Sequence, residues 1–468
     1  EALENIREGF LGTELGKVVM ACGTGKTLVG LWAAEQLESD RTLVIVPSLS
    51  LISQVAIEWL SNCSRPISPL FVCSDESIKD DVDQFIDEVS SIGFSVTTNV
   101  NEILYYAQTA PFEHQVIFCT YQSAKRISEA HKNGLEEFDL VIADEAHHTV
   151  GEINDPFAIV LHKDLIKSRK KLFMTATPKY VNKAVITKKS NIGIEVVSMD
   201  NEYYYGPYFY ILNFGEAIKQ NLLSDYRVII NIVTNSEMRE LIESRKLILH
   251  NESGIETDAL TISMMAGFIH AVEKYNLTHV ITFHNTIRQA KKMSDGLNQL
   301  FPVLYKNYNE DECMIKHIAS RGMTISERTR RLSQFKNADQ GVNILTNARC
   351  LTEGVDIRAV DGIVFFEPKK SKIDILQSVG RAIRKSNPPK TGTVLLPIVI
   401  EDNEDPSIAL ENSNFRYIWD VLEAMKEHDD ILYDELTQIR TNVGKLGGYK
   451  GDLPERLTLD VSEKIDDH

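Results

Sequence analysis

The stretch that decides the fold is Met20-Ala21-Cys22-Gly23-Thr24-Gly25-Lys26-Thr27, which lies between an apolar run and an amphipathic segment. The apolar run, Lys17–Ala21, is predicted to be a buried strand, and Thr27–Leu37 is predicted to be the helix that follows it. Glycines at such a turn let backbone N–H groups close around phosphates, while a lysine supplies positive charge and a threonine hydroxyl can ligate Mg²⁺. The stretch therefore predicts a nucleotide-phosphate-binding loop that comprises Ala21, Cys22, Gly23, Thr24, Gly25, Lys26 and Thr27.

The same alternation of apolar runs and amphipathic segments continues along the chain. In the first half we predict strands at Thr42–Val46, Gln115–Thr120, Leu140–Ala143 and Lys171–Met174. The pattern stops near Val185, and a second set is predicted at His279–His284, Asn343–Asn347, Gly362–Phe366 and Thr393–Ile400. Predicted helices include Leu51–Leu60, Glu327–Phe335 and Lys372–Lys385. Strands that alternate with helices indicate βαβ units, so the predicted fold class is α/β, with two halves that each contain a parallel sheet flanked by helices.

The remaining segments suggest how the halves are connected. An aromatic-rich stretch that includes Tyr203–Tyr210 is predicted to be a packed connector, although its rings could also stack nucleic-acid bases. Residues 236–274 and 414–427 are predicted to be helical, and the acidic C-terminal end is predicted to be a solvated tail or a linker. The predicted organisation is a first domain at 1–200, a connector at 201–235, a second domain at 236–400 and a small, mostly helical and acidic C-terminal appendage at 401–468.

A second group of polar residues follows another predicted strand. Asp144-Glu145-Ala146-His147 comes directly after the apolar run Leu140–Ala143. An acid at the carboxyl end of a strand, across from a phosphate-binding loop, can hold Mg²⁺, and a second acid can polarise an attacking water. A solvated turn is the alternative interpretation of this tetrapeptide alone. His147-His148 has no further His or Cys at zinc-ligand spacing, so we expect Mg²⁺, held by Thr27 and Asp144, and no zinc.

A third group lies in the second half, at Gln377-Ser378-Val379-Gly380-Arg381-Ala382-Ile383-Arg384. Arg381 and Arg384 are three residues apart, which on a helix places them on one face. Two such arginines can clamp a γ-phosphate during its transfer, whereas a solvated basic face is the alternative for this segment alone. Together with the loop, the segment predicts a site that is complete only when both halves meet over ATP. Its predicted catalytic residues are Lys26, Asp144, Glu145, Gln377, Arg381 and Arg384.

These three groups give the chain a resemblance to a superfamily 2 helicase core of the DEAD/DEAH-box-like type, which has two tandem RecA-like domains. The resemblance covers about Leu15–Leu396. Further motifs occur in the order of the superfamily, at Val46-Pro47-Ser48-Leu49-Ser50, Cys119-Thr120-Tyr121-Gln122, Thr175-Ala176-Thr177-Pro178, Ile281-Thr282-Phe283-His284-Asn285 and 346–356. Met20 replaces the first glycine of the general loop pattern, as is usual in this superfamily. The chain is most similar to the helicase parts of type III and single-polypeptide restriction and phage-defence enzymes, on the evidence of residues 214–226, 347–357 and 369–384.

The resemblance implies a role for each motif. Nucleic-acid contacts are expected from Pro47, Ser48, Thr120, Tyr121, Gln122, His284, Asn285, Thr346 and Asn347. Coupling between hydrolysis and strand movement is expected from His147, Thr175, Ala176 and Thr177, and contact with the ATP site from Gly354 and Asp356. The implied activity is that of an ATP- and Mg²⁺-dependent helicase or translocase that drives a restriction or phage-defence system. An RNA helicase or RNP remodeller has the same motifs, as does a nucleic-acid-gated ATPase switch that does not translocate.

The charge of the whole chain does not by itself indicate a nucleic-acid partner. The chain has 468 residues, with 50 Lys and Arg against 67 Asp and Glu, which gives a formal net charge of −17. Nucleic-acid-binding proteins usually show a basic footprint. Basic residues are concentrated locally, because Asp164 is the only acid in residues 163–189, and residues 320–336 and 369–390 are also rich in Lys and Arg. We therefore expect local phosphate contacts with nucleic acid. The resemblance to restriction enzymes implies that DNA is favoured over RNA.

Other features of the composition narrow the cellular setting. No run approaches the length of apolar sequence that a membrane span requires, and the six cysteines show no CxxC spacing, which favours a reducing, cytoplasmic compartment. The chain starts at Glu1 without a signal-peptide pattern, so we expect it to be the interior of a longer protein. The resemblance also implies an adenine-reading glutamine upstream of Glu1, and a nuclease or other defence subunit, fused or separate, as a partner.

Overall fold

The computed structural model describes residues 1–73, 95–112, 114–234, 259–306, 308–319, 322–338, 340–348, 360–366, 371–385, 390–400, 416–426, 429, 432–434 and 456–461. The chain divides into two compact units, Glu1–Asn213 (unit 1) and Phe214–His468 (unit 2). Each unit has a parallel sheet flanked by helices, which confirms the predicted α/β fold class. Every predicted strand is present, with its ends within three residues of the predicted ones.

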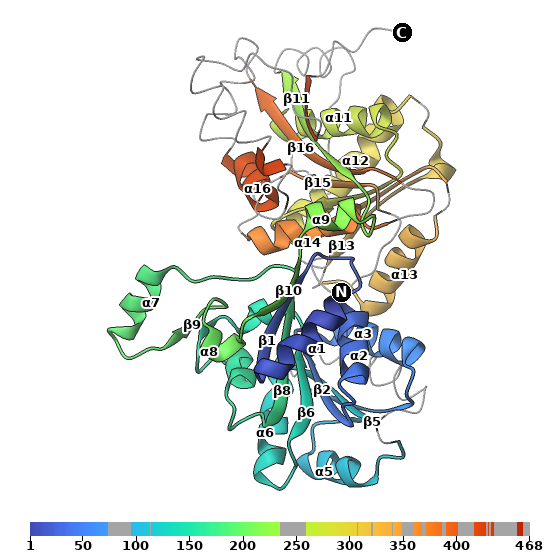
Figure 1. The fold of residues 1–468 in the computed structure, drawn as a ribbon. Coiled ribbons are helices and arrows are strands. Elements are labelled where there is room, and N and C mark those ends of the chain that lie inside the picture. The colour runs from blue at the N-terminus through green and yellow to red at the C-terminus, as the bar shows by residue number, and fades with distance from the viewer. Residues whose placement is uncertain are drawn as a thin grey trace. The chain divides into compact units, whose positions relative to one another are not determined.

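The sheet of unit 1 is entirely parallel, in the order β10-β1-β8-β6-β2-β5-β3-β4 (Figure 1). Its strands are β1 (Leu15–Met20), β2 (Arg41–Val46), β3 (Ile67–Val72), β4 (Ser95–Thr97), β5 (His114–Thr120), β6 (Phe138–Ala143), β8 (Ser168–Thr175) and β10 (Tyr208–Leu212). The central strands are apolar on both faces, because helices cover both faces. A separate antiparallel pair consists of β7 (Gly151–Glu152) and β9 (Val196–Val197).

One face of this sheet is covered by α2 (Lys26–Gln36) and α3 (Leu49–Asn62), with α1 (Ala2–Gly12) packed against α2. Gly30 of α2 faces the sheet, and a Cβ there would make ordinary van der Waals contacts, 3.5 Å from Met174 Sδ and 3.6 Å from Trp59. The other face is covered by α5 (Val100–Thr109), α6 (Ala124–Lys132) and three 3₁₀ turns, η1 (Tyr121–Ser123), η2 (Ala146–Thr149) and η3 (Pro156–Leu161). Two further helices, α7 (Lys183–Ser190) and α8 (Glu202–Tyr205), precede β10.

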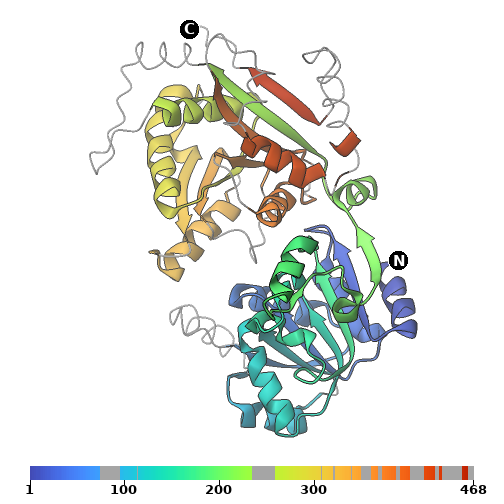
Figure 2. The ribbon, with the colours of Figure 1, turned by 90° about the vertical axis from the view of Figure 1, so that its left-hand side faces the viewer.

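The sheet of unit 2 is also parallel, in the order β13-β14-β12-β15-β16-β11-β17 (Figure 2). Its strands are β11 (Tyr226–Thr234), β12 (His279–Phe283), β13 (Cys313–Ala319), β14 (Val342–Ala348), β15 (Gly362–Phe365), β16 (Gly392–Ile400) and β17 (Leu457–Val461). Helices α11 (Ala259–Lys274) and α12 (Ile287–Leu304) form one core with the sheet. The other helices are α9 (Phe214–Lys219), α13 (Ile325–Lys336), α14 (Lys372–Ala382) and α16 (Arg416–Lys426), with a short turn, η4 (Glu310–Glu312), before β13.

Residues 201–235 do not form the separate connector that the sequence predicts. Strand β10 pairs with β1 in the sheet of unit 1, and β11 pairs with β16 in the sheet of unit 2. The physical reason is packing: Phe209 of β10 lies against Phe10 with ring centroids 4.8 Å apart, and the apolar side chains of β11 are buried in the second core. Only α9 lies between the two sheets in sequence.

The C-terminal appendage predicted at 401–468 also needs correction. Strand β17 lies within the predicted acidic tail, yet it pairs in parallel with β11 at the edge of the second sheet. Its Asp460 is buried and accepts a hydrogen bond from Lys274 Nζ at 2.6 Å, so this acid is neutralised by an ion pair in the folded unit. The predicted helices at 236–258 and at the two ends of 414–427 lie outside the described residues. Among the described helices, none is long and apolar enough to cross a membrane.

Candidate active site

The predicted site segments of unit 1 lie at one edge of its sheet. The loop Ala21–Gly25 follows β1, Asp144 follows β6, and Thr175–Thr177 end β8. The order β1-β8-β6 makes these three strands neighbours. Because all three are parallel, their carboxyl ends meet at the same edge, which is where open α/β sheets bind ligands.

The phosphate-binding loop has the backbone that its glycines allow. Gly23 and Gly25 have φ angles of 85° and 87°, in the left-handed region that residues with a Cβ rarely adopt. Helix α2 starts at Lys26, and no side chain caps its N-terminus. A Cβ on Gly25 would have no atom within 4 Å, so the space in front of this helix end is open. The end of a helix with free N–H groups is a ready site for a phosphate.

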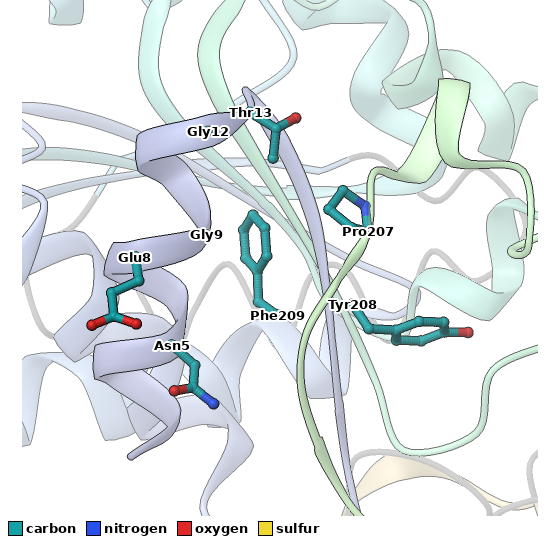
Figure 3. Close-up of a pocket in the computed structure, with 8 residues that line it drawn as sticks. All are labelled: Asn5, Glu8, Gly9, Gly12, Thr13, Pro207, Tyr208 and Phe209. Atoms are coloured by element: carbon teal, nitrogen blue, oxygen red, sulfur yellow. The ribbon is translucent and has the colours of Figure 1, made fainter.

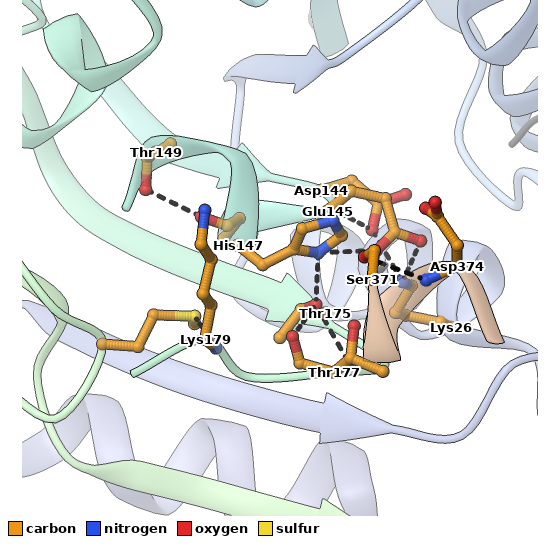
Figure 4. A network of polar contacts seen from close by, with 12 residues as sticks. Lys26, Asp144, Glu145, His147, Thr149, Thr175, Thr177, Lys179, Ser371 and Asp374 are labelled. Atoms are coloured by element: carbon orange, nitrogen blue, oxygen red, sulfur yellow. Dashed lines mark hydrogen bonds and ion pairs between the residues drawn. The ribbon is translucent and has the colours of Figure 1, made fainter. Parts of the chain in front are cut away.

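Lys26 links the loop to the acidic pair (Figure 4). Its Nζ lies 2.7 Å from Glu145 Oε1 and 3.3 Å from Asp144 Oδ1, and all three side chains are largely buried. Burial alone would lower the pKa of Lys26, but the two carboxylates outweigh this and raise the pKa above its ordinary value. The lysine is therefore held as a cation at the point where a phosphate would approach the loop.

The two acids differ in their electrostatics. Burial raises the pKa of Asp144, and although Lys26 opposes this effect, the negative charge of Glu145 adds to it, so the net shift is upward. Burial would also raise the pKa of Glu145, but Lys26 and His147 outweigh it, and the net shift is downward. Glu145 therefore remains an anion that can accept a proton. It has a φ of 49°, a left-handed conformation that costs a non-glycine residue about 1–3 kcal/mol and is often found at functional sites.

His147 connects the acidic pair to the end of β8. Its Nδ1 lies 3.0 Å from Thr175 Oγ1 and 3.4 Å from Glu145 Oε2 (Figure 4). Thr175 Oγ1 donates to the Thr177 carbonyl at 3.3 Å and accepts from the Thr177 N–H at 3.1 Å. The predicted coupling residues His147, Thr175 and Thr177 thus form one buried network with Glu145, and Ala176 is buried between the two threonines in sequence.

Two buried aromatic residues support the site in ways that the sequence did not reveal. Tyr121, which we predicted to contact nucleic acid, is 0% exposed, and its hydroxyl donates to the main-chain carbonyl of Asp144 at 2.8 Å. Trp59 donates from its indole N–H to the Thr27 carbonyl at 3.1 Å and so ties α3 to the first turn of α2. Strand β5 and η1 place the Tyr121 side chain in the core of unit 1, and a nucleic-acid contact at this position stays a prediction.

The other predicted nucleic-acid residues of unit 1 also follow strand ends. Pro47 and Thr120 are buried, Ser48 is half-buried and caps α3 by accepting from the Leu51 N–H at 3.4 Å, and Gln122 is exposed. Those of unit 2 lie at the ends of β12 and β14. His284 is buried, which lowers its pKa to about 3, and its Nε2 lies 2.8 Å from Thr282 Oγ1. Asn285 is half-buried, and Thr346 and Asn347 are 0% exposed.

The arginine segment differs from its prediction. Helix α14 ends at Ala382, so Arg384 lies beyond it and does not share a helical face with Arg381. The chain leaves the helix because Arg384 forms a β-bridge with Leu223 and the Ile383 carbonyl accepts from the Ser224 N–H at 2.8 Å. Gln377 is in α14 and 5% exposed. The side chain of Arg381 and the whole of Gly354 and Asp356 lie outside the described residues.

A surface pocket of about 480 Å³ lies between α1 and β10 (Figure 3). Its lining comprises Asn5, Glu8, Gly9, Gly12, Thr13, Pro207, Tyr208 and Phe209. None of these residues carries a positive charge, and none belongs to the loop or to the acidic pair. The pocket is therefore not where this unit would hold a phosphate.

The residues at the loop fit a nucleotide with its magnesium ion. A buried oxygen of Glu145, Oε2, has no hydrogen-bond partner of ordinary length in the described part of the chain. Carboxylate, hydroxyl and phosphate oxygens are the ligands that Mg²⁺ prefers, and Asp144 and Thr27 supply the first two kinds. In its fold and in the residues at this loop, the chain is similar to a superfamily 2 helicase core of the kind found in restriction enzymes.

Two family models and a curated protein show what the chain is similar to in sequence. Residues 1–180 match the family model of the type III restriction enzyme res subunit, and residues 260–386 match that of the helicase conserved C-terminal domain. Among curated proteins, the chain is 24% identical over 446 residues to the probable helicase A859L of African swine fever virus (isolate Tick/South Africa/Pretoriuskop Pr4/1996). This match covers 94% of the chain and 45% of the viral protein.

Two solved structures are similar over 98% of the chain. One is the ATP-dependent type ISP restriction-modification enzyme LlaBIII bound to DNA, with 25% identity, a TM-score of 0.76 and 31% of that chain covered. The other is a nuclease-deletion mutant of the type ISP enzyme LlaGI in complex with a DNA substrate mimic, with 27% identity, a TM-score of 0.64 and 30% of that chain covered. The chain thus spans less than half of the viral relative and about a third of each restriction enzyme.

Proposed function

We propose that the protein is a DNA translocase that serves as the motor of a restriction or phage-defence system. The observation that carries the proposal is the buried network of Lys26, Asp144, Glu145, His147 and Thr175, which joins the phosphate-binding loop to the end of β8. The similarity to two DNA-bound restriction enzymes supports DNA as the substrate. In such a system a nuclease or another subunit, fused or separate, would act beside the motor.

We assign the following roles in hydrolysis. The charge of Lys26 and the N–H groups at the start of α2 hold the β- and γ-phosphates. Thr27 and Asp144 would hold the magnesium ion, which would supply positive charge beside the phosphate oxygens. Glu145, which its lowered pKa keeps ionised, polarises the attacking water. We further propose that Arg381 and Arg384 stabilise the charge on the transferred phosphoryl group, with Gln377 in the same motif and Gly354 and Asp356 in contact with the nucleotide.

We propose that His147 couples the phosphate site to the end of β8. When the charge near Glu145 changes, the contacts of His147 with Glu145 and with Thr175 change together, because both converge on Nδ1. Thr175 and Thr177 then transmit the change to the segment that follows β8. Pro47, Ser48, Thr120, Gln122, His284, Asn285, Thr346 and Asn347 follow or end strands of the two sheets, and we propose that their segments touch the nucleic-acid backbone.

A triplex-displacement assay separates a translocase from an ATPase switch. A translocase that starts on duplex DNA removes a third strand placed downstream, and it does so only with hydrolysable ATP. Parallel reactions with single-stranded DNA and with RNA as stimulators of ATP hydrolysis separate a DNA motor from an RNA helicase. Displacement that depends on ATP supports the proposal. DNA-stimulated hydrolysis without displacement would show a switch, and stimulation by RNA alone would show an RNA helicase.

A further inference from the structure

One segment of unit 1 lies outside its sheet and its layers of helices. The chain leaves β8 at Thr175, runs out through Lys179, forms α7 and β9, and comes back at Met199; we name residues 179–199 the α7 excursion. Helix α7 has no buried residue, and Figure 1 shows it away from the sheet of unit 1. Hydrophobic burial therefore does not explain why this helix is present.

The base of the excursion is well anchored. The Met199 N–H donates to the Lys179 carbonyl at 3.2 Å, and the Val181 N–H donates to Ser198 Oγ at 3.0 Å. Strand β9 pairs with β7, and Lys189 Nζ of α7 lies 2.8 Å from Glu152 Oε1 of β7. The excursion is thus held by defined contacts at both of its ends.

The excursion is basic in a chain with an overall net charge of −17. Its only acid is Glu195, which accepts a hydrogen bond from Tyr204 at 2.6 Å. Lys179, Lys183 and Lys188 are exposed and have no ion-pair partner among the described residues. Three exposed cations on a segment with a single acid complement a dense row of negative charges.

The excursion also connects directly to the catalytic network. Its outgoing end follows Thr177, which exchanges hydrogen bonds with Thr175, the partner of His147. The strand that supports its returning end, β7, begins two residues after η2, which contains His147. Only a few residues therefore separate Glu145 from each end of the α7 excursion.

We propose that the α7 excursion is an additional DNA contact that holds the backbone phosphates of duplex DNA through Lys179, Lys183 and Lys188. Duplex DNA fits better than a single strand, because α7 has no aromatic side chain on which an unpaired base could stack, and the exposed Tyr180 beside Lys179 is held by a hydrogen bond between its hydroxyl and that of Tyr208 at 2.5 Å. A duplex offers one negative charge per about 1.7 Å of its axis, about twice the density along one of its strands. The inference rests on the proposed function, since it assigns a further surface to the same motor.

The test measures how the affinity for duplex DNA depends on salt in a Lys183→Gln/Lys188→Gln variant. The matched control is Arg7→Gln/Lys132→Gln, which removes two exposed cations of unit 1 outside residues 163–189, one in α1 and one at the end of α6. Each lost phosphate contact reduces the slope of log K against log salt by about 0.9, so the α7 variant should lose about 1.8 from the slope. Its affinity should fall several-fold at about 200 mM salt, whereas the control should match the wild type.

Three outcomes would overturn the inference. Equal slopes for the α7 variant, the control and the wild type would show that α7 makes no phosphate contact, while leaving the DNA motor intact. A change of slope on single-stranded DNA but not on the duplex would show that these lysines contact single-stranded DNA and not duplex DNA. A wild type that neither binds duplex DNA nor hydrolyses ATP faster in its presence would contradict both this inference and the proposed function.

Discussion

At the scale of single residues, the site depends on buried polar side chains whose partners come from distant parts of the sequence. Lys26 and Glu145 are far apart along the chain, yet their charged atoms lie 2.7 Å apart. Tyr121 lies beneath them and fixes the main chain at Asp144 through its hydroxyl. Tyr121 therefore helps to set the positions of Asp144 and Glu145, although we assign it no contact with the phosphate-binding loop.

Replacement of Tyr121 by Phe tests this positioning role. The change removes the donor to the Asp144 carbonyl and should lower kcat for ATP hydrolysis several-fold with little change in KM for ATP, because the loop that binds phosphates is untouched. Tyr205→Phe is the matched control, since Tyr205 is equally buried and its hydroxyl lies 2.8 Å from Thr149 Oγ1. Both variants should lose about 1 kcal/mol of stability. An equal kcat in the two variants would contradict the role of Tyr121.

Lys171 provides a pH-dependent prediction. Burial, with a smaller effect from the charge of Lys163, lowers its pKa from 10.5 to about 7. Between these values the unfolded chain binds a proton that the folded chain does not, so this group makes the free energy of unfolding rise with pH from about 7 to about 10.5. The stability of the wild type relative to Lys171→Met should therefore increase from pH 7 to pH 10 in urea unfolding.

The neighbouring Lys170→Met variant is the control for that experiment, because Lys170 lies on the same strand but is only half-buried. The free energy of unfolding of the wild type is compared with that of each variant across pH. If this difference does not change with pH for Lys171→Met, or changes equally for Lys170→Met, Lys171 keeps its proton in the folded chain. Its Nζ would then be a buried ammonium that donates to the Val160 carbonyl at 2.8 Å.

At the scale of elements, the close approach of α1 to β10 depends on a missing side chain. A Cβ on Gly9 would lie 2.3 Å from the ring of Phe209, whereas a Cβ on Gly12 of the same helix would have no atom within 4 Å. Gly9→Ala should lower the free energy of unfolding by about 1–3 kcal/mol, although alanine favours a helix. Gly12→Ala should be neutral or slightly stabilising.

Urea unfolding of both glycine variants checks this prediction, and a Phe209→Ala background provides the coupling test. With the ring removed, Gly9→Ala should lose most of its destabilising effect, since the clash is with that ring. If Gly9→Ala is as stable as Gly12→Ala, the packing of α1 on β10 is looser than described here.

The sequence predicted those elements whose signals are local. The loop at Gly23 and Gly25 and the apolar strands around it follow from residue type and spacing, so they were found within three residues of their true ends. Of the strands in the two sheets, β3, β4, β10, β11, β13 and β17 were not predicted. Strand β11 is a buried apolar run whose local signal was overlooked, whereas β17 lies in an acidic segment and is explained only by its pairing with β11. Arg384 was assigned to a helix for a similar reason, since its bridge to Leu223 depends on a contact far away in the sequence.

At the scale of the whole molecule, the net charge of −17 and a DNA substrate are compatible because the charges are distributed unevenly. The α7 excursion and the phosphate-binding loop carry local positive charge, while Lys26 is balanced by two acids until a phosphate enters. Binding through a few local contacts should be modest and should weaken steeply with salt. The grip on DNA should therefore depend more on the nucleotide state than on overall attraction.

The most direct test of the central claim is the rate of ATP hydrolysis by the wild type and by Glu145→Gln, each with and without duplex DNA. We expect that duplex DNA accelerates hydrolysis by the wild type, and that Glu145→Gln still binds ATP but hydrolyses it at least about 100-fold more slowly. Hydrolysis that ignores DNA in the wild type, or a Glu145→Gln variant that keeps the wild-type rate, would contradict the central claim.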